Sequence, residues 1–178
     1  MSEKVLKIKN FLIWKDPSVT VISTFQDFLV NELKIPEYSA SQKRSIYKFI
    51  KVLLGESKNI EDARMKLLDD CAEKDEDGKP KTVQTLDENG KEIGQRYDIS
   101  PDNMKKFVED FRALMEEDFI MVVDASNEKS IEDVKSIVLN SKQRFDKNNT
   151  ELKDVIPFMD LYENICLIFE HREEEVKE

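Results

Sequence analysis

Two short stretches of the sequence set acidic residues directly before a glycine, as many calcium-binding loops do. They are DEDG, which ends at Gly78, and DENG, which ends at Gly90. A calcium loop of this kind has its glycine at position six and needs a bidentate glutamate at position twelve. Position twelve falls on Gln84 in the first stretch and on Arg96 in the second. Both stretches lack the closing carboxylate, so we expect neither to bind a metal.

The residues around these stretches predict a β-hairpin over about residues 79–99. Apolar side chains occupy strand-like positions, namely Val83, Leu86, Ile93 and Tyr97. The pair Asn89-Gly90 is typical of a tight hairpin turn in which both residues take positive φ. We therefore expect DEDG to end the preceding helix and DENG to join two short strands.

The rest of the chain offers no recognisable catalytic or cofactor-binding set. The single histidine, His171, lies in an acidic C-terminal segment where an exposed side chain is typical. Gly-rich phosphate loops and CxxC, HExxH and GxSxG motifs are absent. Carboxylate pairs such as Glu116-Glu117 are typical of solvated helix faces, and a hydrolase that uses two carboxylates stays an open alternative. We expect a non-enzymatic protein without a cofactor.

Composition indicates a helical fold and argues against two kinds of partner. The chain has 178 residues, of which 39% are hydrophobic and 37% charged, with only 4 Gly and 5 Pro. This balance favours long amphipathic helices. A net charge of −10 argues against direct binding to nucleic acid or to an anionic membrane. Cys71 and Cys166 lie far apart in helical apolar patterns, so we expect buried free thiols and a reducing compartment, with no secretion signal or membrane span.

Apolar periodicity predicts a single domain, residues 1–178, that is mainly α (α+β): an elongated helical bundle with a β-hairpin and a short two-stranded sheet. In chain order we expect a strand at 4–14, a helix capped by Ser18 and ended by Pro36, a long helix at 41–74, a helix at 100–117, a strand at 118–126 that pairs with the first, and helices at 128–146 and 150–172. Gly55 leaves open whether the long helix bends or divides.

The helix at 100–117 carries a narrow apolar stripe. Its members are Met104, Phe107, Val108, Phe111, Leu114 and Met115. This spacing indicates either core packing or a coiled-coil seam.

Three features of residues 41–170 occur together in one protein family. A helix starts with small and basic residues (SASQKR), a charged helix ends in an acidic DE-D/N-G turn, and a closing helix carries Tyr162 ahead of Phe169-Glu170. In these features the chain resembles a family of small uncharacterised proteins encoded by bacteriophages and prophages. It departs from them in residues 1–38 and in the extended hairpin. The resemblance implies a phage origin and a small helical accessory protein, with no established catalytic residues to carry over.

Two functions follow from these observations. The first is a non-enzymatic protein that binds other proteins as a virion component or assembly factor, because helices with apolar stripes supply interfaces. The alternative is an inhibitor of a host enzyme or defence system, whose acidic helices mimic the charge of DNA. The partners would be phage structural proteins or a host protein, or further copies of the chain, in the virion or the host cytoplasm.

Two surfaces are the candidates for partner binding. One is the basic cluster at the start of the long helix: Lys43, Arg44, Lys48 and Lys51. It would contact an acidic partner or form a solvated helix face. The other is the hairpin tip: Asp87, Glu88, Asn89, Gly90 and Lys91. It would insert between neighbouring subunits or form a loop without contacts.

Overall fold

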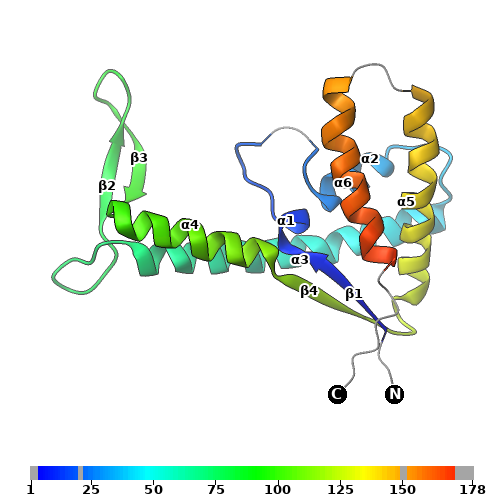
Figure 1. The fold of residues 1–178 in the computed structure, drawn as a ribbon, viewed down its shortest axis with the longest axis horizontal. Helices are drawn as coiled ribbons and strands as arrows, with labels where there is room; N and C mark the ends of the chain where they lie inside the picture. The colour runs from blue at the N-terminus through cyan, green and yellow to red at the C-terminus, as the bar shows by residue number, and fades with distance from the viewer. Residues whose placement is uncertain (1–3, 20–21, 149–151, 171–178) are drawn as a thin grey trace. The chain divides into compact units, whose positions relative to one another are not determined.

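The computed structural model of the chain describes residues 4–19, 22–148 and 152–170. Over these residues it has six helices and two antiparallel two-stranded sheets (Figure 1). The elements are β1 (Lys4–Lys9), α1 (Asn10–Ile13), α2 (Phe25–Glu32), α3 (Ala40–Cys71), β2 (Thr82–Leu86), β3 (Glu92–Tyr97), α4 (Pro101–Glu116), β4 (Asp118–Val123), α5 (Glu128–Asn148) and α6 (Leu152–Glu170). The predicted class, mainly α with a β-hairpin and a separate two-stranded sheet, is confirmed.

The chain divides into two compact units. Unit 1 comprises Met1–Lys58 and Glu117–Glu178, and unit 2 comprises Asn59–Glu116. Helix α3 contributes its first part to unit 1 and its last part to unit 2, and it is continuous through Gly55. This division into units does not test whether the chain folds as one domain. The single domain over residues 1–178 therefore stays a prediction.

The sheet of unit 1 joins two strands that are far apart in the sequence. β1 pairs antiparallel with β4, from Lys4 opposite Val123 to Lys9 opposite Asp118, as predicted. The predicted strand at 4–14 is too long, because the chain turns into α1 after Lys9. The backbone N–H of Asn10 donates to the carbonyl of Glu117 at 3.0 Å. A continuous apolar run does not by itself distinguish a strand from a buried helix, which explains the error.

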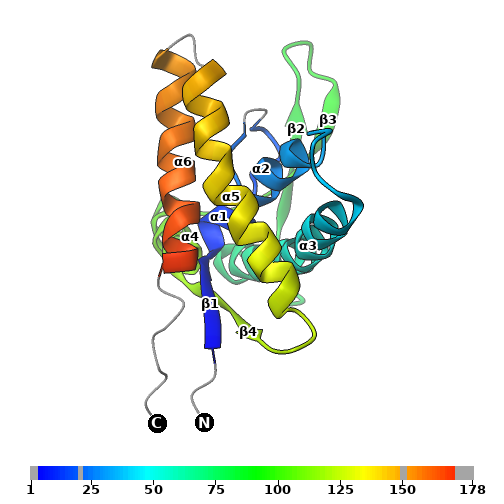
Figure 2. The same cartoon turned by 90° about the vertical axis from the view of Figure 1, so that its right-hand side faces the viewer.

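The core of unit 1 centres on the ring of Phe25, which is fully buried. Its centroid lies 5.4 Å from that of Phe49 on α3 and 6.2 Å from that of Phe169 on α6, at an edge-to-face angle of 87°. Other large side chains that are fully buried in this unit are Leu6, Ile8, Ile13, Leu29, Ile46, Leu53, Ile131, Val134, Ile137, Val138 and Ile165. They come from β1, from α1, α2 and the first part of α3, and from α5 and α6, which lie side by side in Figures 1 and 2. Apolar burial from several elements is what makes this unit a closed core.

Helix α2 begins later than the sequence predicts. Ser18 does not cap it; the Ser18 N–H and hydroxyl both donate to the carboxylate of Asp16 in a local turn. Thr24 is the cap, and its hydroxyl accepts the N–H of Asp27 at 3.1 Å. Both residues are good caps by type, so composition alone does not choose between them.

Unit 2 consists of the last part of α3, the hairpin β2–β3 and helix α4. The two helices run antiparallel, since Arg64 lies over the ring of Phe111 (6.0 Å) while Leu68, further along α3, lines a cleft with Met104, earlier in α4. The Ser100 hydroxyl caps α4 by accepting the N–H of Asn103 at 3.3 Å, so this helix starts where the sequence predicts. In residues 59–116, all of which the structure describes, only three are buried: Ile60, Cys71 and Ala72.

Candidate binding surfaces

The hairpin tip is a hydrogen-bonded turn organised by Asp87. Its Oδ1 accepts the N–H of Asn89 at 2.9 Å and the N–H of Lys91 at 2.8 Å, and its carbonyl accepts the N–H of Gly90 at 3.0 Å. Gly90 has φ of 79°, while no non-glycine residue that the structure describes has positive φ. The prediction that both Asn89 and Gly90 take positive φ is therefore wrong. The tip is a β-turn followed by a left-handed glycine, a loop type in which one residue needs that conformation.

The other acidic stretch folds into the same turn. Oδ1 of Asp75 accepts the N–H of Asp77 at 3.0 Å and the N–H of Lys79 at 2.8 Å, and Gly78 has φ of 77°. DEDGK and DENGK thus form the same turn. In both, the aspartate at the first position accepts two backbone N–H groups and the glycine at the fourth takes positive φ. In each turn one carboxylate oxygen accepts two backbone N–H groups. This accounts for the acidic residue before each glycine without a metal.

The base of the hairpin is closed by a ring of three backbone hydrogen bonds. Glu73 donates to the carbonyl of Asp98 (2.8 Å), Asp98 to that of Lys81 (2.9 Å), and Lys81 to that of Glu73 (2.7 Å). Beside the ring, a hydrogen bond to the Asp69 carboxylate, with smaller contributions from burial and its charge, raises the pKa of the Tyr97 hydroxyl. The hairpin is therefore anchored to the end of α3 and presents its tip on an ordered base.

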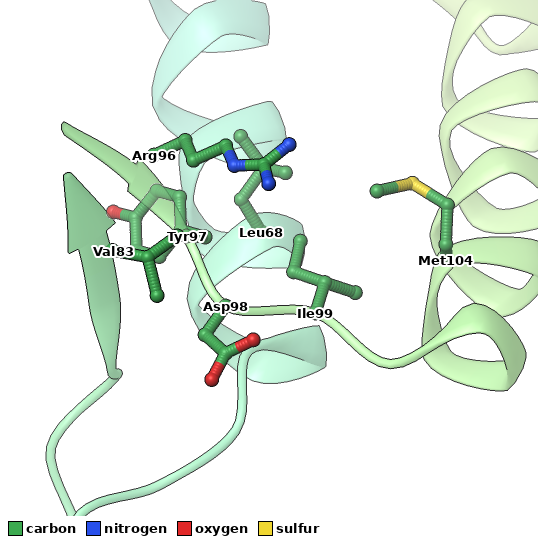
Figure 3. Close-up of a pocket in the computed structure, with 7 residues that line it drawn as sticks. All are labelled: Leu68, Val83, Arg96, Tyr97, Asp98, Ile99 and Met104. Atoms are coloured by element: carbon green, nitrogen blue, oxygen red, sulfur yellow. The ribbon is translucent and has the colours of Figure 1, made fainter. Parts of the chain in front are cut away.

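Next to this base lies an open cleft of about 330 Å³. Its lining residues are Leu68, Val83, Arg96, Tyr97, Asp98, Ile99 and Met104. Figure 3 shows the Met104 side chain on one side, facing Leu68 and Ile99 across the cleft, with Arg96 extended above them. The lining is mostly apolar and holds no paired acid and base, so the cleft offers contact area for a partner side chain and no evident chemistry.

The two apolar residues beside the hairpin tip are exposed to solvent. Leu86 is 54% exposed and Ile93 64% exposed. In the tip itself Asp87 is half-buried, and the following residues through Lys91 (Glu88, Asn89, Gly90) are exposed. The structure therefore places the predicted tip on the surface of unit 2, flanked by Leu86 and Ile93, which the sequence marked as strand residues and not as exposed surface.

The basic cluster lies on the first part of α3, in unit 1. Arg44, Lys48 and Lys51 are exposed and share one helix face, while Lys43 is half-buried and lies beside it. Lys51 Nζ lies 5.0 Å from the centre of the Tyr47 ring, a cation–π contact. The cluster and the hairpin tip belong to different units, so the structure does not bring the two predicted surfaces into one site.

A third surface lies along α4, which has no buried residue. Met104 is 43% and Val108 46% exposed, and Phe111 and Met115 on the same face are half-buried. We call these four residues the α4 strip. α3 covers part of the strip: Arg64 lies 6.0 Å from the centre of the Phe111 ring, which also stacks on the ring of Phe107 with centroids 5.7 Å apart. The sequence left open whether the stripe packs in a core or forms a coiled-coil seam, and the structure shows that α3 covers only part of it.

The described ranges 4–19, 22–148 and 152–170 contain no group of three or more His, Cys, Asp or Glu side chains placed to hold a metal ion. Cys71 is a buried free thiol, as predicted, and Cys166 is free but only half-buried. His171 lies outside the described residues. Within those residues, no helix has the length and apolar character needed to cross a membrane.

Comparison with known proteins adds no further constraint. No protein family, no curated protein sequence and no solved structure matches the chain. The resemblance of residues 41–170 to bacteriophage proteins therefore stays a prediction.

Proposed function

We propose that the protein acts by binding other proteins rather than by catalysis, and that it is a virion component or an assembly factor of a bacteriophage. The phage setting comes from the sequence resemblance. The binding role is supported by the α4 strip, in which Met104 and Val108 are exposed and Phe111 and Met115 are only half-buried, although the helix is well capped and long.

An amphipathic helix in a monomer normally turns its stripe to a core. Unit 2 has one other helix segment and a hairpin to cover α4, and this leaves Met104 and Val108 about half exposed. Apolar residues left in one contiguous row are typical of a surface that a protein partner covers. The hairpin tip and the cleft beside Met104 extend the same unit's contact surface.

The test is the protein content of purified phage particles and of assembly intermediates. Mass spectrometry should find the chain in stoichiometric amounts in one of the two. A phage carrying Val108→Asp, which places a charge in the α4 strip, should lose most of the bound protein. Ala113→Asp is the matched control, because Ala113 is exposed on the opposite side of α4. Absence of the wild-type chain from both samples, with abundance in infected cells, contradicts the proposal.

A host inhibitor that mimics DNA is the second candidate, and the matching acidic turns support it. DEDGK and DENGK present carboxylates on unit 2 at fixed positions, since each turn is held by its own aspartate. Such an inhibitor should retain a nucleic-acid-binding host protein at low salt and release it at moderate salt or when duplex DNA is added. No captured partner of this kind at low salt counts against it.

A further inference from the structure

Beside the α4 strip runs a second row of side chains with the same spacing. Each of its members directly follows a residue of the strip: Lys105, Glu109, Arg112 and Glu116, all exposed. We call this row the charged flank. Both rows advance by four, three and four residues, so they run in parallel along one side of the helix. This spacing is unchanged when the helix is turned end for end.

The charge order of the flank is self-complementary only in one orientation. Read forward it is positive, negative, positive, negative; read backward it is the reverse. A second α4 in antiparallel orientation would set Lys105 against Glu116 and Glu109 against Arg112. In a parallel pair with the strips facing each other, the two flanks would lie on opposite sides of the seam and could not contact each other.

The apolar strip is compatible with the same antiparallel pairing. Met104 then lies opposite Met115 of the other copy, and Val108 lies opposite Phe111. A small branched side chain against a large ring, flanked by two flexible methionines, is a combination that interdigitates well.

We propose that α4 pairs antiparallel with α4 of a second copy of this chain, strip against strip and flank against flank, to give a symmetric dimer. This inference rests on the proposed protein-binding role of the α4 strip and names its partner. Because the same surface is used on both copies, the contact is closed by a two-fold axis and forms dimers rather than open polymers.

The size of the face places the contact among the small interfaces, which are commonly weak. A helix of this length is about 24 Å long, and a pair of helices is about 20 Å wide. The face shared by α4 and the adjoining part of α3 therefore buries on the order of 1,000 Å² over both copies, at the lower limit for a specific interface. We expect a dissociation constant in the micromolar range.

The competing explanation for the flank is pairing within one helix. Lys105–Glu109 and Arg112–Glu116 are four residues apart, a spacing that supports a lone helix by roughly 0.2–0.5 kcal/mol per pair. The contact that the structure records for Lys105 is a different one: its Nζ lies 3.8 Å from Oδ1 of Asp102, with both side chains largely exposed. Pairing within a helix does not depend on protein concentration, whereas pairing between copies does.

The experiment is sedimentation equilibrium of the full chain from about 1 to 300 µM, a range that brackets the expected affinity. The wild-type chain should shift from monomer to dimer. K105E/R112E makes the flank wholly acidic and E109K/E116K makes it wholly basic, and each should raise the dissociation constant about tenfold or more. An equimolar mixture of the two should form heterodimers with at least the wild-type affinity. The fourfold exchange K105E/E109K/R112E/E116K restores the alternation and should dimerise like wild type.

K66E/K106E is the matched control. It makes the same change in net charge at two exposed positions, and Lys106 lies on the side of α4 opposite the strip. It should leave the dissociation constant within about twofold of wild type, since distant surface charges contribute little. Far-UV circular dichroism confirms that each variant keeps its helix content.

Three results would overturn the inference: a wild-type chain that stays monomeric throughout, charge variants that dimerise as well as wild type, or a mixture that forms no heterodimer. The proposed function fails separately. A monomeric chain that Val108→Asp removes from particles overturns the self-pairing and leaves the binding role standing. A chain that dimerises but is absent from particles and intermediates overturns the proposed function and leaves the self-pairing standing.

Discussion

Helices α4 and α5 have similar apolar periodicity but differ in how far their apolar residues are buried. In α5 the periodic residues Ile131, Val134, Ile137 and Val138 are all buried. Helix α6 packs against α5, and the Ser45 hydroxyl of α3 donates to Asp133 of α5 at 2.6 Å. In α4 none is buried.

The difference lies in the number of elements around each helix. Unit 1 surrounds its core with helices and a sheet, whereas unit 2 offers α4 one antiparallel helix segment and a hairpin. Two helices alone cannot enclose a stripe that is wider than their line of contact. Periodicity therefore predicts that a helix has an apolar face, and the surrounding elements decide whether the chain itself covers that face.

The largest expected effect is on stability, and it tests this contrast in packing between the two units. Phe25→Ala in unit 1 should lower the free energy of unfolding by about 3–5 kcal/mol, the usual cost of emptying a buried aromatic site. Phe107→Ala in unit 2 should cost only about 1 kcal/mol, because its ring is half exposed. Urea unfolding followed by fluorescence of Trp14, the single tryptophan and a residue of unit 1, and by circular dichroism measures both. Equal costs for the two variants would mean that unit 2 holds a core after all.

The turns of unit 2 provide the next test. Gly90→Ala should destabilise the hairpin by about 1–2 kcal/mol, because alanine must take a left-handed conformation there. No atom lies within 4 Å of a Cβ built at Gly90, so the cost is conformational rather than steric. Asn89→Ala, the matched control, should cost less than about 0.5 kcal/mol, since Asn89 has negative φ. Hydrogen exchange of the Asp87 amide, which donates to Lys91 at 2.8 Å, reports hairpin opening.

The contrast between these two turn residues also shows how far the sequence predicts the fold. Glycine, proline and capping residues located most elements: Ser100-Pro101 started α4 as expected, and the hairpin formed between its two predicted strands. The Asn-Gly pair predicted the position of the turn correctly, but it did not predict the turn type. Asp87, two residues earlier, decides the type through two hydrogen bonds that no pairwise rule on Asn-Gly includes.

The surfaces were less predictable than the elements, for a physical reason. Leu54 of α3 is 48% exposed although its neighbour Leu53 is fully buried, because burial depends on which elements lie alongside. The same dependence left open whether the chain itself would cover the apolar stripe of α4. The basic cluster was predictable as exposed, since lysine and arginine are seldom buried, but no charge pattern reveals its partner.

A smaller expected effect comes from the ion pair that supports α2 in unit 1. Burial alone would raise the pKa of Asp27, but Lys15, whose Nζ lies 2.8 Å from Oδ2, and the N–H of Ser23 outweigh it and lower the pKa. Asp27→Asn should lower the free energy of unfolding by about 1 kcal/mol at pH 7. Because the folded pKa is depressed, the contribution of Asp27 is fully present above its unfolded pKa of about 3.9 and is lost as pH falls through the lower folded value. Urea unfolding at pH 7 and near pH 3 should show the difference between wild type and variant shrinking; a constant difference contradicts the assignment.

The smallest expected effect comes from the hydrogen bond between Tyr97 and Asp69 in unit 2. Both groups are half-buried and border solvent, so Asp69→Asn should change the free energy of unfolding by only a few tenths of a kcal/mol. The pKa is the sharper readout. In an ultraviolet titration, Tyr97→Phe should remove a component that ionises above the ordinary tyrosine pKa of about 10, and Asp69→Asn should move that component to lower pH. A raised folded pKa means that this hydrogen bond stabilises the hairpin below the unfolded pKa of about 10 and that the contribution is lost as pH rises through the folded value. A titration curve above that pH that Tyr97→Phe leaves unchanged would contradict the raised pKa of Tyr97 and leave the hairpin anchored by its backbone ring alone.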